Sequence, residues 1–418
     1  SAVRPQRRGR LEGPLRTAWS MAVTRTILEA SNDAGEEEAR RRQQWRAMVQ
    51  HGLSRFVQEQ PEVFKRRACR GVPAEHRWQA WKAALKIEDK VQHGKYQEYL
   101  QVENQWTRLI EIDIPRTFPE MPLFDKEQQF SLLRILNAFA NFDPAVGYCQ
   151  GMNFLAGLLL LVAQNGDFRE SPKLEKEEEA FWMLTCLMSE CGLCGFYRLH
   201  FPLLRRYMAA FDQLMVEHIP DLQEHFKREN VQHAVYLHQW FLTLFINCMP
   251  MEMVLIFWDA IVCGGRGVEV ILPLTITMLQ VLKDVLLALA FEDILRLFKS
   301  MRFDDTDVDA ATIGRLLVSR CAAIRLPTRM TTRLRAPLPE DDSTPMSPDA
   351  CADKEFFFSP AGRQHAEGED ISEEGSSLFG TYLQQFSKMR QDLPQIPQGM
   401  MSWLEDARDN FHWAGSGP

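Results

Sequence analysis

The sequence predicts an all-α protein, and two observations support that fold class. Apolar residues recur at helical spacing through most of residues 45–325, whereas alternating apolar and polar stretches bounded by turn residues are nearly absent. The chain of 418 residues is long enough for one large domain with extensions or for two domains. No internal repeat with a period of roughly 20 to 50 residues is visible, which argues against a regular helical solenoid.

The first clear helix follows Pro73, a residue type suited to a helix start. In residues 74–85 the side chains of Trp78 and Trp81 share one face at helical spacing. We therefore expect Trp81 to pack in the core, with Arg77 beside it as a buried charge whose hydrogen bonds are satisfied.

Later segments repeat the helical pattern. Residues 128–140 carry an apolar stripe, and residues 202–219 carry another, which Pro220 should end or kink. The apolar runs at 238–262 and 272–301 continue with the same spacing.

Composition divides the chain into three parts. Residues 1–58 form an N-terminal extension, rich in Arg and Glu at first and partly helical near its end. Residues 59–325 form the helical domain. Residues 326–418 are rich in proline, serine and acidic residues, a composition that buries too little apolar surface to order itself. We expect both extensions to be flexible and the C-terminal one to be a mostly disordered tail.

The charge balance argues against nucleic acid as a partner. The net charge is -8, with a sequence pI near 5.8, so the chain lacks a global positive field. A basic cluster is confined to the first ten residues.

The nine cysteines favour a reducing compartment. Their number is odd, and most lie within apolar stretches, as buried thiols of cytoplasmic proteins do. Cys186, Cys191 and Cys194 have the C-x4-C-x2-C spacing of a plant-type iron–sulfur loop, so a redox or metal site is one hypothesis. Because the segment continues an apolar helix, we favour core thiols over metal ligands by about ten to one.

Membrane-spanning segments and nucleotide-binding motifs are both missing. The apolar window at 154–163 is short, and the window at 268–291 contains charged residues, so neither spans a hydrocarbon core of roughly 30 Å. The chain has no GxxxxGK[ST] and no GxGxxG, and GGRG at 264–267 is too short to cradle a nucleotide. It also has no HExxH and no GxSxG, the motifs of zinc proteases and α/β-hydrolases.

Arg116 lies in an unusual segment, IEIDIPRTFP, at residues 110–119. Asp113 precedes it by three residues, and an ordinary ion pair between the two is the simplest interpretation. However, Pro115 fixes the backbone before Arg116, and the segment lies between helices, where loops often carry function. Arg116 is therefore a candidate site residue.

A second unusual turn, DPAVGYCQGMN, follows about thirty residues later. It offers Gln150, whose amide can accept and donate hydrogen bonds, between Tyr148 and Gly151. An arginine that stabilises phosphoryl charge and a glutamine that orients water are the two side chains that fast GTP hydrolysis requires. Without a phosphate loop of its own, the chain could supply them in trans.

The two segments resemble motifs of the TBC domain family of Rab GTPase-activating proteins. IEIDIPRTFP fits the family's IxxDxxR motif through Ile110, Asp113 and Arg116. YCQ fits the family's YxQ motif through Tyr148 and Gln150.

The resemblance extends beyond these two motifs. RGVPAEHRWQAW is similar to the start of the family's domain, and WFLTLF followed by MP and FWD is similar to its later helices, so the resemblance runs from about residue 60 to 325. The chain departs from the family pattern at IFWD, where a basic residue often precedes the WD pair.

The resemblance implies a TBC-type domain of two helical subdomains, with both segments side by side in a groove that receives a GTP-bound Rab GTPase. Arg116 would be an arginine finger, and Gln150 would be a glutamine finger that places the attacking water. Asp113 and Tyr148 would support the two segments. The chain would be a GTPase activator without a nucleotide site or cofactor of its own, because GTP and Mg²⁺ belong to the partner.

One alternative stays open, a catalytically silent TBC-fold scaffold that binds a GTPase or a trafficking partner. The presence of both finger residues ranks the activator first. The resemblance further implies a cytoplasmic protein of vesicle trafficking, which would reach endomembranes only indirectly, through the Rab.

Overall fold

The computed structural model describes residues 34–122, 124–165, 173–198, 200–299, 301 and 309–338. The helices, in chain order, are α2 (Ala34–His51), α3 (Leu53–Glu59), α4 (Pro61–Ala68), α5 (Ala74–Leu85), α6 (Ile87–Lys90), α7 (Lys95–Leu100), α8 (Thr107–Asp113), η1 (Ile114–Arg116), α9 (Lys126–Phe142), α10 (Met152–Asn165), α11 (Lys173–Ser189), η2 (Cys194–Phe196), α12 (Pro202–His218), α13 (Pro220–Arg228), α14 (Ala234–Leu242), α15 (Met251–Cys263), η3 (Gly267–Val270), α16 (Ile271–Leu286), α17 (Phe291–Lys299), α18 (Ala310–Cys321) and α19 (Thr328–Arg335).

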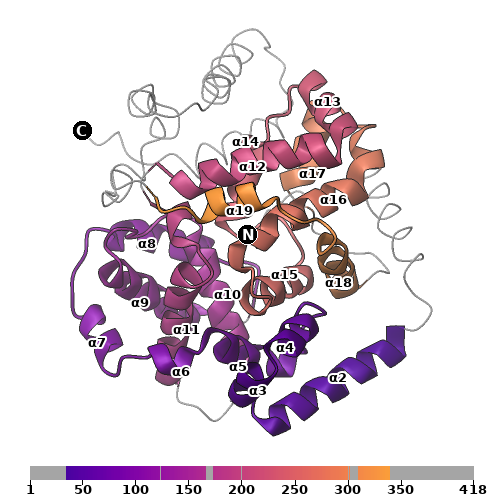
Figure 1. The fold of residues 1–418 in the computed structure, drawn as a ribbon. Helices are drawn as coiled ribbons and strands as arrows, with labels where there is room; N and C mark the ends of the chain where they lie inside the picture. The colour runs from indigo at the N-terminus through magenta and orange to yellow at the C-terminus, as the bar shows by residue number, and fades with distance from the viewer. Residues whose placement is uncertain are drawn as a thin grey trace, which may run out of the picture.

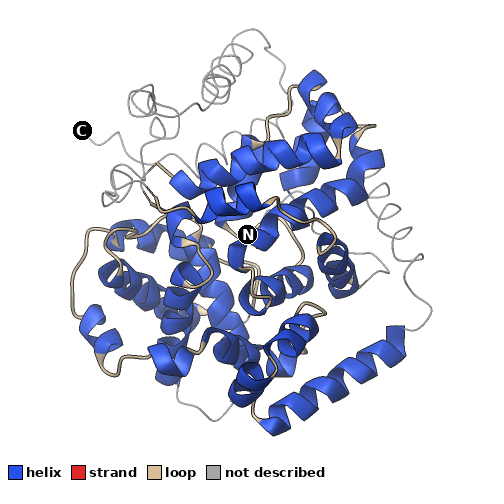
Figure 2. Cartoon of the chain, viewed as in Figure 1, coloured by secondary structure: helices blue, strands red, loops and turns tan. Residues whose placement is uncertain are grey.

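Every regular element in these ranges is a helix, which confirms the all-α prediction (Figure 2). The helices gather in two groups, α6–α11 on one side and α12–α14 with α16 and α17 on the other (Figure 1). Helix α15 packs against α5 and α18. Helix α5 in turn packs against α10 of the first group, and α18 packs against α16 of the second, so these three helices connect the groups. Within the described part of the chain, no helix combines the length and the apolar character needed to cross a membrane.

Helix α2 is joined to the domain by its apolar residues. Trp45 and Met48 are fully buried, and the Trp45 ring makes an edge contact with Phe64 of α4 at 5.8 Å between ring centroids. The packed domain therefore begins before residue 59, where the sequence placed its start. Residues 1–33 of the expected N-terminal extension lie outside the described residues.

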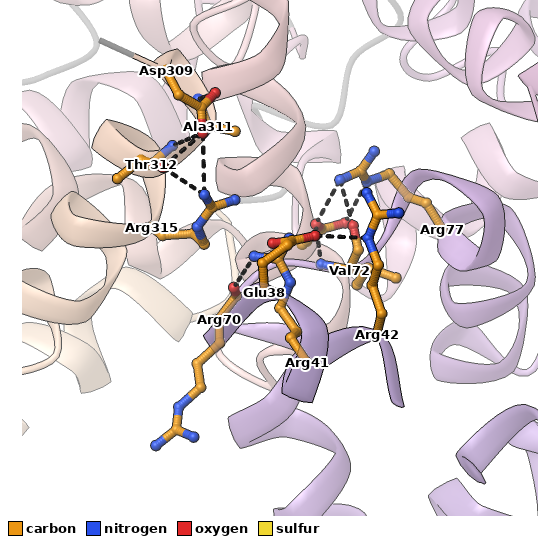
Figure 3. Close-up of polar contacts among 11 residues, drawn as sticks. Glu38, Arg41, Arg42, Arg70, Val72, Arg77, Asp309, Ala311, Thr312 and Arg315 are labelled. Carbon is orange, nitrogen blue, oxygen red and sulfur yellow. Dashed lines mark hydrogen bonds and ion pairs between the residues drawn. The ribbon is translucent and has the colours of Figure 1, made fainter. Parts of the chain in front are cut away.

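A buried carboxylate, Asp259 of α15, connects that helix to the start of α5. It accepts hydrogen bonds from the Arg77 guanidinium (Nε–Oδ1 3.0 Å), the Trp81 indole (Nε1–Oδ1 2.9 Å) and the Val72 amide (N–Oδ2 2.8 Å). Arg77 also donates to the carbonyl of Val72, and Figure 3 shows the two residues side by side. The predicted roles of Trp81 and Arg77 in the core are confirmed. Burial raises the pKa of Asp259, and the Arg77 charge opposes that rise.

The run at 238–262 is not one continuous helix. Helix α14 ends at Leu242, and α15 begins only after Pro250. Leu244 and Phe245 between them adopt positive φ angles of 43° and 68°, which interrupt the helix, and both side chains are buried. By contrast, Pro220 ends α12 and opens α13, as the sequence predicts.

The packed domain also continues past residue 325. Helix α19 lies within the expected tail and rests on α12, where Arg206 donates to the main-chain carbonyls of Ala336 (2.6 Å) and Pro337 (3.1 Å). Arg335 of α19 binds the carboxylate of Glu269 with two hydrogen bonds. The hydrogen bonds of Arg206 and Arg335 thus attach α19 to the domain although this helix is poor in apolar residues. Residues 339–418 of the expected tail lie outside the described residues.

We predict that Asp259→Ala lowers the free energy of unfolding by about 3–5 kcal/mol, because it leaves the buried Arg77 charge without its partner. Urea denaturation measures the effect. The control is Glu62→Ala, which removes an exposed ion pair with Lys65 and should change stability little. Equal effects of the two substitutions would show that Asp259 does not tie α15 to α5.

Candidate functional site

Arg116 lies on a short helical turn rather than in a loop. Helix α8 ends at Asp113 and runs directly into the 3-10 helix η1, so the expectation of a loop between helices was wrong for this segment. Pro115 fits the first turn of η1, where its missing N–H removes no hydrogen bond. The turn presents Arg116 at the surface, with about 40% of its side chain exposed.

The Arg116 guanidinium has only a loose contact within the described structure. Its Nη1 atom lies 4.0 Å from Oδ1 of Asp113, the limit for an ion pair and too far for a hydrogen bond. A pair this exposed and this long contributes little stability. The simple surface ion pair therefore does not account for Arg116, and its N–H donors remain available to a ligand.

Gln150 lies on the second segment, the turn that precedes α10. It is half-buried, and its side-chain amide makes no hydrogen bond to a described residue. Gly147 and Gly151 on either side adopt positive φ angles of 60° and 110°. A Cβ atom at Gly147 would collide with the Trp106 indole, and one at Gly151 would lie 3.0 Å from the carbonyl oxygen of Leu242. The turn that presents Gln150 is therefore tightly packed against Trp106 and Leu242.

A buried hydrogen bond joins the two segments. The Tyr148 hydroxyl donates to Oδ2 of Asp113 at 2.7 Å, and both residues are buried. Burial raises the pKa of Asp113, while the hydrogen bond from Tyr148 and the charge of Arg116 oppose the rise. One carboxylate thus contacts Tyr148, two residues before Gln150, and faces Arg116 with its other oxygen.

Thr117 and Asn153 form a second link, which the sequence reasoning missed. Asn153 donates from Nδ2 to Oγ1 of Thr117 at 2.8 Å and accepts from the Gly151 amide at 3.0 Å. Thr117 in turn donates to the main-chain carbonyl of Asp113 at 2.9 Å. The available signal was Asn153 itself, the lone polar residue at the start of the apolar run MNFLAGLLLL, because a buried amide requires partners.

Aromatic packing supports the segment just after Arg116. Phe118 adopts a positive φ of 49° and turns its ring into the core. Its ring makes edge contacts with Phe124 at 5.6 Å and with Phe154 of α10 at 5.8 Å between centroids. Gly157 of α10 allows this close approach, since a Cβ there would lie 2.9 Å from the Phe118 ring. Helix α10 therefore follows directly after the Gln150 turn and also packs against Phe118 of the Arg116 segment.

The cysteine cluster has the surroundings of core thiols. Burial raises the pKa of Cys186, and it raises the pKa values of Cys191 and Cys194 to about 12, so these thiols keep their protons at neutral pH. In the ranges that the structure describes, no group of three or more His, Cys, Asp or Glu side chains could hold a metal ion.

Comparison with protein families places the chain among known domains. The family model of the Rab-GTPase-TBC domain matches residues 74–287. The chain is 33% identical over 245 residues to the Rab GTPase-activating protein eat-17 of Caenorhabditis elegans, covering 58% of this chain and 26% of that protein. It is 27% identical over 260 residues to the GTPase-activating protein GYP5 of Saccharomyces cerevisiae, covering 62% and 27%. The chain thus spans about a quarter of the length of these relatives.

Two solved structures share the fold. The Ypt/Rab-GAP domain of Gyp1p aligns with a TM-score of 0.53 at 24% identity, over 63% of this chain and 92% of that domain. The Chlamydomonas flagellar RabGAP TBC domain aligns with a TM-score of 0.54 at 22% identity, over 75% and 96%. Since the family model covers just over half of the 418 residues, the chain belongs to the Rab-GTPase-TBC domain family.

Proposed function

We propose that the chain is a GTPase-activating protein for a Rab-family small GTPase, with Arg116 and Gln150 as the two residues that it lends to the partner's GTP. Membership of the Rab-GTPase-TBC family and relatives whose names describe GTPase activators support the class of activity. The geometry of the site supports the assignment of the residues.

One observation carries the assignment, the hydrogen bond from Tyr148 to Asp113. It brings together two segments that are more than thirty residues apart, and each segment presents one partly exposed side chain beside the contact. Neither Arg116 nor Gln150 makes a hydrogen bond to the rest of the described protein. Side chains that have a fixed backbone but no hydrogen bond within the protein are suited to contact a bound partner.

Arg116 would act on the phosphates of the partner's GTP. In the transition state of hydrolysis, negative charge spreads over the transferring phosphoryl group and the leaving oxygen. A planar guanidinium neutralises this charge with directed N–H donors, an effect worth about 10³ to 10⁵ in rate for arginine fingers. The contact with Asp113 is loose enough for Arg116 to exchange it for phosphate oxygens.

Gln150 would orient the attacking water. Its amide oxygen can accept a hydrogen bond from the water while its NH₂ group donates to a phosphoryl oxygen. Holding the water in line with the phosphoryl group converts a loose encounter into a positioned reaction. The packed glycines on either side of the turn fix the backbone, so little ordering is needed at the moment of reaction.

The partner would supply the rest. The nucleotide and its Mg²⁺ would arrive with the Rab, and contact with endomembranes would also come through the Rab. The chain would therefore change the rate of hydrolysis without binding nucleotide itself.

We predict that Arg116→Ala and Gln150→Ala each lower the stimulated rate at least about a hundredfold in single-turnover GTP hydrolysis across a panel of purified Rabs. Arg116→Lys should recover little of it, because an ammonium lacks the planar fork. Exposed residues of the same types, tested as Arg325→Ala and Gln101→Ala, are the matched controls and should keep the wild-type rate.

Two results would overturn the proposal. A broad Rab panel without any response to the wild-type chain would favour a scaffold that binds a GTPase silently. Normal stimulation by both finger variants would show that Arg116 and Gln150 are structural.

We predict that Tyr148→Phe lowers the maximal stimulated rate about tenfold while the chain concentration at half-maximal rate stays nearly unchanged, because the fingers lose alignment but the docking surface does not. Tyr96→Phe is the matched control, since it also removes a buried hydroxyl bonded to a carboxylate, that of Glu177. A Tyr148→Phe effect confined to half-saturation would indicate that Tyr148 supports docking instead.

A further inference from the structure

The loop GGRG between α15 and η3 has an unusual backbone. Gly264 and Arg266 are right-handed, with φ of -76° and -102°, and they alternate with Gly265 and Gly267 at +78° and +54°. The amides of Gly265, Arg266 and Gly267 have no acceptor among the residues that the structure describes. Successive amides in alternating right- and left-handed conformations form concave sites, called nests, that bind anions.

Lys65 of α4 lies directly over this loop. A Cβ atom at Gly265 would lie 2.9 Å from Cε and 3.3 Å from Nζ of Lys65, so only glycine leaves room for the lysine there. The ammonium also pairs with the exposed carboxylate of Glu62 at 2.7 Å. A surface pair of this kind is easily exchanged for a stronger anion.

Arg266 has no counterion within the described structure. It is half-buried, and it makes neither an ion pair nor a hydrogen bond through its side chain. Its charge opposes the rise that burial causes in the pKa values of Cys69 and Cys321, so it lies between the end of α4 and the end of α18. The neighbouring buried carboxylates are engaged elsewhere, Glu269 by Arg335 and Asp259 by Arg77.

The segments next to the loop, the end of α4 and the end of α18, lie in arginine-rich parts of the sequence although the whole chain carries a net charge of -8. Residues 309–338 contain six arginines and one aspartate. On α4 and the turn after it, Arg66 and Arg70 are exposed. Figure 3 shows the Arg70 side chain directed away from Glu38 and Arg41. An approaching anion would therefore meet a positive local field.

We propose that the GGRG loop, Lys65 and Arg266 form a binding site for a small anion that bears several phosphate groups. Backbone amides, an arginine fork and a lysine point charge together satisfy the oxygens of phosphate groups and their charge. The site shares no residue with the proposed finger segments, so it stands independently of the proposed function. Its ligand is either the headgroup of a phosphorylated inositol lipid or a free inositol phosphate.

The test uses the full chain and two probes. Calorimetric titration with inositol hexakisphosphate measures a free anion. Flotation with phosphatidylcholine vesicles that contain phosphatidylinositol bisphosphate measures a lipid headgroup, and vesicles with phosphatidylserine at equal total charge serve as the comparison. We expect saturable binding to at least one phosphorylated probe, and capture by the inositol lipid above that by phosphatidylserine would identify a membrane ligand.

Arg266→Gln and Lys65→Gln should each weaken that binding about tenfold while urea unfolding and GTPase stimulation stay unchanged. Arg329→Gln, an exposed arginine of α19, is the matched control and should bind like the wild type. The proposal is overturned by an absence of saturable binding to inositol hexakisphosphate together with equal capture on both kinds of vesicle, or by full binding in the Arg266 and Lys65 variants.

Discussion

The hydrogen bond between Tyr148 and Asp113 is the constraint on which the geometry of the candidate site depends. A carboxylate as deeply buried as Asp113 is costly without a hydrogen-bond donor, so the fold must bring a donor to it. The donor that arrives is two residues from Gln150, and the carboxylate is three residues from Arg116. The hydrogen bond that the buried Asp113 carboxylate requires therefore also fixes where the side chains of Arg116 and Gln150 reach the surface.

Other buried polar side chains also join separate segments of the fold through hydrogen bonds. Asp259 joins the start of α5 to α15 by accepting hydrogen bonds from three donors. Asn153 joins the Arg116 and Gln150 segments, because it donates to Thr117 of the first and accepts from Gly151 of the second. Both polar groups lie inside an apolar helix and specify which segments meet. The residues proposed to act on GTP need only to project from this framework, so Arg116 can stay loosely held without losing its position.

Much of this arrangement could be predicted from the sequence because it is local. Helical periodicity predicted the fold class, Pro73 and Pro220 predicted helix starts, and two unusual segments that resemble TBC motifs supplied the candidate site residues. The link between Thr117 and Asn153 could not be predicted, because its partners are distant in the chain and only packing selects them. The packing of α2 and α19 onto the domain was missed for a related reason, since a few residues such as Trp45 dock otherwise polar helices.

Arg116 and Gln150 are proposed to contact the same nucleotide in its transition state. The most direct measurement is complex formation with a GDP-loaded Rab in the presence and absence of aluminium fluoride, which completes a mimic of the transferring phosphoryl group. We predict a stable complex only when aluminium fluoride is present, and we expect either Arg116→Ala or Gln150→Ala to weaken it at least about a hundredfold. A complex that forms equally without aluminium fluoride, or that survives both substitutions, would contradict it.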